Sequence, residues 1–153
     1  MSIEIKILRE GDEAILDRVA EDVFDNAINP DLAREFLTDP RHHLAVALDG
    51  GQVVGIVSAV HYVHPDKPPE LWMNEVSVAG THHRRGIGRS LIAAILECGR
   101  ALGCVQAWVL TDRDNRAAMQ LYAGAGGREA PKDTVMFEFD LRLRLTMGPG
   151  CGL

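Results

Sequence analysis

Apolar and polar residues alternate with a period of two in several segments of the chain, a pattern typical of half-buried strands. One hairpin is strongly indicated, because the turn Asp49-Gly50-Gly51 separates two such segments. The stretch 104–110 is mostly apolar, which predicts a buried strand. The predicted strands are 2–8, 43–48, 52–62, 70–79, 104–110 and 134–141.

Apolar residues at helical spacing predict four helices between these strands. Gly11-Asp12-Glu13 opens an amphipathic run that continues to Phe24, and a short helix around Phe36 ends before Pro40. The predicted helices are 12–24, 32–37, 86–102 and 116–125. The resulting order, β-α-α-β-β-β-α-β-α-β, predicts an α/β (α+β) protein with one domain at 1–145 and a flexible tail at 146–153.

Composition places the chain among ordinary globular proteins, since 46% of its 153 residues are hydrophobic and 25% are charged. No apolar run reaches 18 residues and the N-terminus alternates as a strand, so we expect neither a membrane span nor a signal peptide. The three cysteines, Cys98, Cys104 and Cys151, lack metal-type spacing. They predict reduced thiols in a cytoplasmic protein without a metal site.

The net charge of −6 is unevenly distributed along the chain. Residues 1–75 hold 15 acidic and 6 basic residues, whereas residues 76–153 hold 7 acidic and 10 basic ones. The acidic part is expected to repel nucleic acid and to attract a cationic substrate. Acidic surface helices that only keep the protein soluble would give the same balance, so both interpretations stay open.

The segment 76–92 has the features of a phosphate-binding loop. It reads as the end of a strand, a polar turn with Gly86 and Gly88, and the start of an apolar helix. Unpaired N–H groups in the first turn of a helix bind anions, and Arg84, Arg85 and Arg89 add positive charge. The spacing matches neither a Walker loop nor a dinucleotide fingerprint.

The spacing instead resembles the acyl-CoA loop of GNAT acetyltransferases, Gln/Arg-x-x-Gly-x-Gly/Ala, with His83 in place of the first Gln or Arg. A second segment resembles another pattern of the same family. It reads Asn115-x-x-Ala118-x-x-Leu121-Tyr122-x-x-x-Gly126, and Gly127 stands where the family has an aromatic residue. The resemblance implies the GNAT fold. In that fold a mixed, mostly antiparallel sheet splays between strands 70–79 and 104–110, and helices cover both faces.

The resemblance also implies that acetyl-CoA binds in the slot between the splayed strands. Backbone groups of 76–78 would pair with the pantetheine arm, and one N–H would polarise the thioester carbonyl. The phosphate loop would hold the pyrophosphate, while Asn115 would either contact the cofactor or only cap its helix. The residues assigned to the cofactor are Val76, Ser77, Val78, His83, Arg84, Arg85, Gly86, Ile87, Gly88, Arg89 and Asn115.

Acetyl transfer to an amine needs a base for the ammonium group and an acid for the leaving thiolate. The family motif implies that Tyr122 is the acid, although a half-buried core tyrosine would look the same in sequence. Glu75 is the first choice for the base and Asp112 the second. Glu70, five residues before Glu75, would face the other side of a regular strand unless a bulge intervened. Histidines on loops, such as His64, His82 and His83, are further candidates that are more often simply solvated.

Residues 69–141 resemble the small GNAT-type aminoglycoside 3-N-acetyltransferases. The likeness lies in Pro69-Glu70, Glu75-x-x-Val78-x-Gly80, Leu121-Tyr122 and Phe137-x-Phe139-Asp140. It implies acetylation of the 3-amino group of an aminoglycoside, with Glu70, Glu75 and Asp112, and further Asp25 or Asp31, around the polycation, and it implies a homodimer. The alternatives are a GNAT enzyme for a polyamine, a protein N-terminus or a lysine, and a non-catalytic acetyl-CoA sensor.

Overall fold

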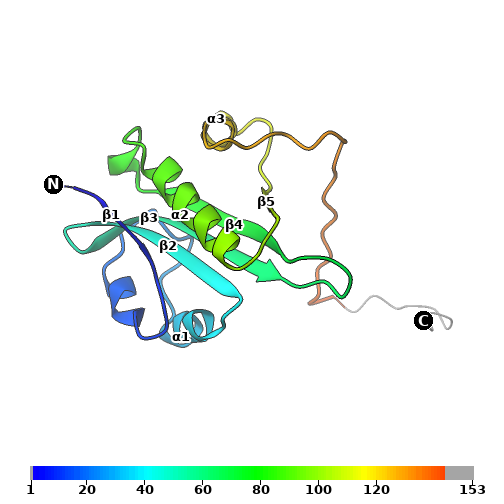
Figure 1. Ribbon diagram of the computed structural model, residues 1–153. Coiled ribbons are helices and arrows are strands. Elements are labelled where there is room, and N and C mark those ends of the chain that lie inside the picture. Colours follow the sequence, from blue (N-terminus) through cyan, green and yellow to red (C-terminus); the bar gives the residue numbers. More distant parts are fainter. Residues whose placement is uncertain (1, 144–153) are drawn as a thin grey trace.

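The computed structural model describes residues 2–143, which form one mixed sheet with helices on both faces (Figure 1). The strands are β1 (Glu4–Ile7), β2 (His42–Asp49), β3 (Gln52–Tyr62), β4 (Glu70–Val78) and β5 (Gln106–Val109). The helices are η1 (Glu13–Asp17), α1 (Pro30–Thr38), η2 (Gly80–His82), α2 (Ile87–Ala101) and α3 (Arg116–Gly124), where η denotes a 3₁₀ helix.

The sheet has the strand order β1-β2-β3-β4-β5. All neighbouring pairs are antiparallel except β4 and β5, which run parallel because α2 connects them as a crossover. The predicted mixed, mostly antiparallel sheet is therefore confirmed. Its central strands β2 and β3 carry most of the fully buried aliphatic residues, so the core surrounds the middle of the sheet.

α2 covers one face of the sheet, while η1 and α1 lie on the other (Figure 1). Ile87, Leu91, Ile92 and Ile95 form the buried side of α2, as the helical spacing predicts. α1 begins at Pro30, whose missing N–H costs nothing in a first turn. Asn29 caps this helix, because its side chain accepts hydrogen bonds from the N–H groups of Asp31 (3.0 Å) and Leu32 (3.2 Å).

The predicted helix 12–24 is wrong: only the 3₁₀ helix η1 forms there. The backbone on either side of Val19 instead bonds to the start of β3, with Val53 N–H donating to Arg18 O (2.8 Å) and Ala20 N–H donating to Val53 O (2.9 Å). A β-branched valine tolerates this extended conformation well. Sheet hydrogen bonds therefore replace the helical ones beyond Arg18.

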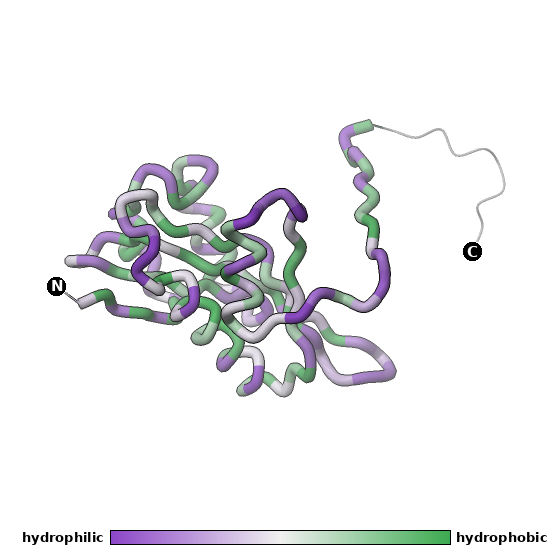
Figure 2. The backbone as a smooth tube through the Cα atoms, turned by 90° about the horizontal axis from the view of Figure 1, so that it is seen from above, coloured by the Kyte–Doolittle hydropathy of each residue, from purple (hydrophilic) through white to green (hydrophobic). Residues whose placement is uncertain are grey.

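Two strand predictions also need correction. The strand predicted at 104–110 is shortened to β5 and is not buried, since Val105 is 72% and Leu110 is 47% exposed. The alternating segment 134–141 forms no strand, and Figure 2 shows it leaving the body of the protein. Alternation predicts which side chains share a face but not whether a neighbouring strand exists to pair with. The predicted tail 146–153 lies outside the described residues.

Among the described residues, no helix has the length and apolar character that crossing a bilayer requires.

Candidate active site

An open slot lies between β4 and β5. The two strands pair only from Glu70↔Gln106 to Met73↔Val109, whereas β4 continues to Val78. The ladder with β3 shifts by one residue between Met73 and Glu75, so Asn74 is the extra residue of a β-bulge. β4 therefore diverges from β5 after the bulge, and the predicted splay is confirmed. Among the described strands, none pairs with the backbone at 74–78 on that side.

The backbone groups of Val76 and Val78 point into this slot. Ala79 N–H donates to Val54 O (2.8 Å), which makes that pair a hydrogen-bonded one. Hydrogen-bonded and non-bonded pairs alternate in an antiparallel ladder, so the pairs of Val78 with Gly55 and of Val76 with Val57 direct their N–H and C=O groups outward. Ser77 directs its backbone toward β3, and its hydroxyl donates to Asp22 O (3.4 Å) on the other face of the sheet.

The phosphate loop between β4 and α2 has a strained backbone. Arg84 has φ 60°, the one positive φ of a non-glycine residue in the described chain, and Gly86 has φ 74° immediately before α2. No atom lies within 4 Å of a Cβ placed on Gly86, so its conformation, rather than lack of space, favours glycine. The loop thus presents the first turn of α2, whose N–H groups lack helical partners.

The second glycine of the loop packs against α3. A Cβ on Gly88 would lie 3.1 Å from Leu121 Cδ1. This close approach brings α3 beside the start of α2, at the mouth of the slot (Figure 1). Glycine at position 88 therefore serves the packing of α3 against α2. Arg84, Arg85 and Arg89 are all exposed, so their charges remain accessible to an anion.

Histidines hold the loop in place. His82 Nε2 donates to Asp49 Oδ2 (2.8 Å) at the end of β2, and this bond lowers the pKa of the Asp49 carboxyl. His83 Nε2 donates to Val78 O (2.7 Å), which fixes the loop to the end of β4. Gly80 N–H donates to Asp22 Oδ2 (2.8 Å). His82 and His83 are thus positioned by hydrogen bonds within the fold, in contrast to the solvated histidines that are common on loops.

α3 carries the second predicted motif. Asn115 caps this helix through a hydrogen bond that its side chain accepts from Ala118 N–H (3.1 Å), so the capping role that the sequence left open is present. Tyr122 is half-buried against the core, and this burial raises the pKa of its phenol above 10. The hydroxyl therefore stays protonated at neutral pH.

The bulge places Glu70 and Glu75 on the same face of β4. Before the bulge, Leu71 faces α2, so its neighbour Glu70 faces away from α2.

After the bulge, Val78 faces α2, because its partner Gly55 packs against that helix. Glu75, three residues before Val78, therefore also faces away from α2. The sequence placed Glu70 and Glu75 on opposite faces of a regular strand unless a bulge intervened, and the bulge at Asn74 is that exception.

The second candidate base lies after β5, on the far side of the slot. Asp112 is exposed, and its backbone carbonyl accepts a hydrogen bond from Asn115 N–H (3.0 Å) as the chain turns into α3. Its carboxylate has no hydrogen bond to another described residue. The slot therefore lies between Glu75 on β4 and Asp112, which follows the end of β5 by three residues.

Three aromatic residues that sequence reasoning missed gather beside Glu70. Trp72 and Trp108 stack with ring centroids 5.0 Å apart and planes 11° apart, and Trp108 Nε1 donates to Tyr62 Oη (2.8 Å). Each lies on a different strand, and only the register brings them together. The available signal was that Trp72 and Trp108 are the only two tryptophans of the chain and that each lies in a predicted strand near the slot.

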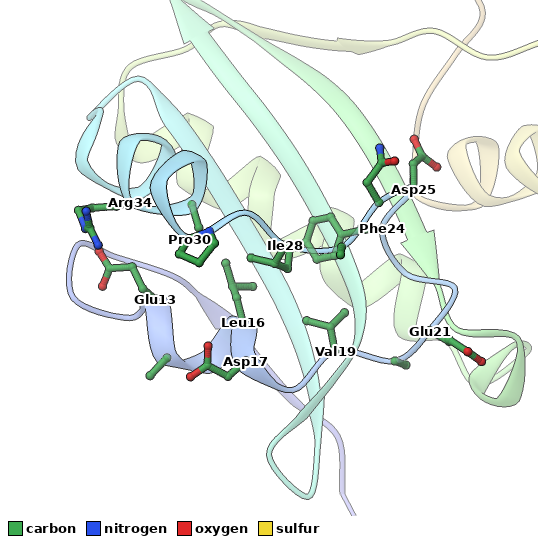
Figure 3. A pocket seen from close by; sticks show the side chains of 15 residues that line it. Glu13, Leu16, Asp17, Val19, Glu21, Phe24, Asp25, Ile28, Pro30 and Arg34 are labelled. Atoms are coloured by element: carbon green, nitrogen blue, oxygen red, sulfur yellow. The ribbon is translucent and has the colours of Figure 1, made fainter.

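A pocket of about 880 Å³ lies between η1, the segment after it and α1 (Figure 3). It contains Asp25, which the sequence proposed as a contributor to cation binding. Asp31 lies outside this pocket and is 3.6 Å from Arg34. The acidic residues in the wall are Glu13, Asp17, Glu21 and Asp25. The pocket shares the sheet face of Glu70 and Glu75 but contains neither of them.

Comparison with known proteins identifies a family and several relatives. The profile of the Acetyltransferase (GNAT) family matches residues 12–126. N-acetyltransferase family 8 member 2 of Rattus norvegicus is 34% identical over 82 residues, which are 53% of this chain and 36% of that protein. The chain thus spans half or less of the length of the curated relatives it matches.

Solved structures with the same fold include two aminoglycoside acetyltransferases. HMB0005, from an uncultured soil metagenomic sample, has a TM-score of 0.76 at 24% identity and covers 92% of this chain and 99% of its own. AAC(6')-Iy, in complex with the bisubstrate analogue CoA-S-monomethyl-acetylneamine, has a TM-score of 0.75 at 18% identity, with 92% and 99% covered. The splayed sheet, the phosphate loop and the family profile lead to one conclusion: the chain belongs to the GNAT family of acetyltransferases, whose acyl donor is acetyl-CoA.

Proposed function

We propose that the protein is an acetyl-CoA-dependent N-acetyltransferase that modifies the 3-amino group of aminoglycosides. The observation that carries the enzymatic part is the unpaired edge of β4 at 74–78, which ends directly in the phosphate loop. An amide-bearing arm can add to such an edge as a strand does. The adjoining helix start can bind the pyrophosphate at its other end.

The residues present fit the cofactor. Val76 and Val78 offer outward backbone groups to the pantetheine amides, and the first turn of α2 offers N–H groups to the phosphates. Acetyl-CoA supplies the activated acetyl group when bound. His83 occupies Val78 O, and the register leaves the N–H groups of Val76 and Val78 without a partner on β3. One of them would polarise the thioester carbonyl.

A base is needed because a primary alkylamine with a pKa near 10.4 is almost fully protonated at pH 7. Glu75 suits this role: it is exposed, adjoins the bulge, and lies one residue before the first outward N–H group at Val76. Asp112 is the alternative from the other side of the slot. Tyr122, which is half-buried and protonated at neutral pH, would donate its proton to the leaving thiolate.

The choice of acceptor rests on the acidic residues near the slot and on the solved structures that share the fold. Glu70 and Glu75 share one face of the sheet with the acidic pocket, which is a suitable environment for a polycation. Two solved proteins of the same fold are named as aminoglycoside acetyltransferases, one of them of the 6'-type. The 3-amino specificity comes from the sequence resemblance of residues 69–141 alone.

Release of free thiol from acetyl-CoA tests this function directly. We expect turnover with kanamycin-like and gentamicin-like amines, and NMR of the product should place the acetyl group on the 3-amino nitrogen. Turnover only with spermidine or with a peptide amine would replace the aminoglycoside by that acceptor. Acetyl-CoA binding without turnover of any amine would indicate a sensor, and absence of binding would contradict the enzyme altogether.

We also propose that the protein is a homodimer in which 134–143 of one copy pairs with another. The apolar residues of this segment are 66–93% exposed, and they are Val135, Met136, Phe137, Phe139, Leu141 and Leu143. β5 ends the sheet, so its outer edge has no neighbour among the described strands. Sedimentation should give a dimer, and Phe137→Ser with Phe139→Ser should give a monomer. A wild-type monomer at micromolar concentration would contradict the dimer.

A further inference from the structure

Five side chains form a connected cluster at the closed end of the slot, which we call the aromatic cluster: Tyr62, His64, Glu70, Trp72 and Trp108. Two hydrogen bonds and two ring contacts connect these residues. Trp108 Nε1 donates to Tyr62 Oη (2.8 Å), and His64 Nε2 donates to Glu70 Oε2 (2.8 Å). Ring contacts connect the rest, with Tyr62 and His64 edge to face at 5.2 Å and the two tryptophans stacked at 5.0 Å.

The register locates this cluster beside the proposed site of transfer. Trp72 and Trp108 are Cα partners in the ladder between β4 and β5, one pair before that ladder ends. Trp72 lies on the face of β4 that points away from α2, which is also the face of Glu75. Trp72 and Glu75 are successive residues on this face, so an acceptor bound at Glu75 would lie beside the tryptophan pair.

The cluster is partly open to solvent, although it contains large apolar rings. Trp72 is 37% exposed, whereas His64 and Glu70 are only 20% and 19% exposed at their side chains. Polar atoms of the cluster bond to one another, so a ligand at its open part would meet Trp72 with the held carboxylate of Glu70 two residues away. Exposed tryptophan faces with a nearby anion are the usual environment for binding an organic cation.

We propose that the aromatic cluster is the acceptor subsite of this enzyme and that it binds an ammonium group carried on a saturated ring. The C–H face of the ring would lie on the tryptophan pair, and Glu70 would be the counter-charge. This inference deepens the proposed function and rests on it. It also gives His64 a positioning role, since its bond to Glu70 holds the carboxylate next to the rings.

Tryptophan fluorescence tests the inference without any need for catalysis. Trp72 and Trp108 are the only tryptophans in the chain, so all tryptophan emission comes from the cluster. Kanamycin does not absorb where tryptophan does. We expect its addition to change the emission in a saturable way in the absence of acetyl-CoA. Glucose, a ring without an ammonium group, should leave the emission unchanged.

Kinetics of variants give a second, independent readout. Trp72→Leu should raise the KM for kanamycin about tenfold, which corresponds to about 1.4 kcal/mol, and should leave the KM for acetyl-CoA unchanged. Trp72→Phe should restore most of the affinity, because it restores a ring. Glu70→Gln should act like Trp72→Leu, whereas Asp66→Asn, which changes an exposed carboxylate of the loop before β4, should have no effect.

The outcomes separate this inference from the proposed function. Turnover of kanamycin with unchanged emission and an unchanged KM in Trp72→Leu would overturn the subsite and leave the acetyltransferase in place. Saturable emission changes with kanamycin, but no acetylation of any amine, would support the subsite and contradict the enzyme. If Trp72→Leu fails to fold, the titration of the wild-type protein decides alone.

Discussion

Tyr122 combines a neutral phenol with a half-buried position. Burial raises its pKa from the ordinary value, so the phenol keeps its proton over the whole physiological range. Because the shift is upward, only pH values above the ordinary range of tyrosine should remove that proton. The preceding residue of the same helix, Leu121, packs against Gly88, which fixes α3 beside the loop.

Tyr122→Phe should therefore lower kcat by about a hundredfold, the usual contribution of a positioned acid. Acetyl-CoA affinity should stay near the wild-type value, since the ring and its packing are retained. Steady-state kinetics together with a cofactor titration checks both quantities. An unchanged kcat would remove Tyr122 from the mechanism.

Glu75→Gln should slow turnover most at low pH, where the ammonium group of the acceptor is hardest to deprotonate. The measurement is the profile of kcat/KM against pH for the wild-type protein, Glu75→Gln and Asp112→Asn. If Asp112→Asn alone shows this loss, the base lies on the β5 side of the slot. A profile unaffected in both variants would contradict a carboxylate base.

At the residue scale, the main-chain roles of Val76 and Val78 were implied by the family resemblance and not by the residues themselves. The outward direction of their backbone groups is set by the register between β3 and β4. The pairs His82–Asp49 and Trp72–Trp108 join separate strands or loops. Such contacts depend on register, which no short window of sequence contains.

At the element scale, the start of α2 depends on one residue with a left-handed backbone. Gly86 has φ 74° and Gly103, just after the same helix, has φ 84°, and a Cβ on either would meet no atom within 4 Å. These two glycines thus differ in position but share the same conformational demand.

Gly86→Ala and Gly103→Ala should each lower the free energy of unfolding by about 1 kcal/mol, the cost of a left-handed alanine. Only Gly86→Ala should also weaken acetyl-CoA binding, because it disturbs the N–H groups of the first turn of α2. Chemical denaturation and calorimetric titration separate the two effects. Equal loss of cofactor affinity in both variants would show that the loop has no special role.

Predicted elements were correct where local periodicity matched the final packing. α1, α2, β2 and β3 came out close to their expected bounds, and α2, β2 and β3 also supply most of the buried core. The helix 12–24 failed because sheet bonds to Val53 outcompete helical ones after Arg18. The strand 134–141 failed because it has no partner among the described strands.

At the scale of the whole molecule, the charge asymmetry becomes a spatial one. The acidic first half forms η1, α1 and the pocket between them, on the face of Glu70 and Glu75. The exposed arginines of the phosphate loop lie beyond the far end of β4 from Glu70. A polycationic acceptor and an anionic cofactor would therefore be drawn to different parts of the surface.

Salt should weaken this attraction. Raising the ionic strength from about 0.05 M to about 0.3 M should lower kcat/KM for kanamycin several-fold, because the Debye length shortens. A monoamine should be affected much less, since it carries a single charge. Kinetics at constant pH check the difference, and equal sensitivity of both acceptors would contradict steering by the acidic face.

The bulge at Asn74 has a consequence for the evolution of β4. On both sides of it, residues that face α2 alternate with residues that face away. Deletion of Asn74 would keep this alternation but would remove the bulge, so β4 would continue beside β5 and close the slot. A chain shortened there should still fold but should no longer take up acetyl-CoA. Natural homologues that transfer acetyl groups should therefore keep the length of β4 at this position.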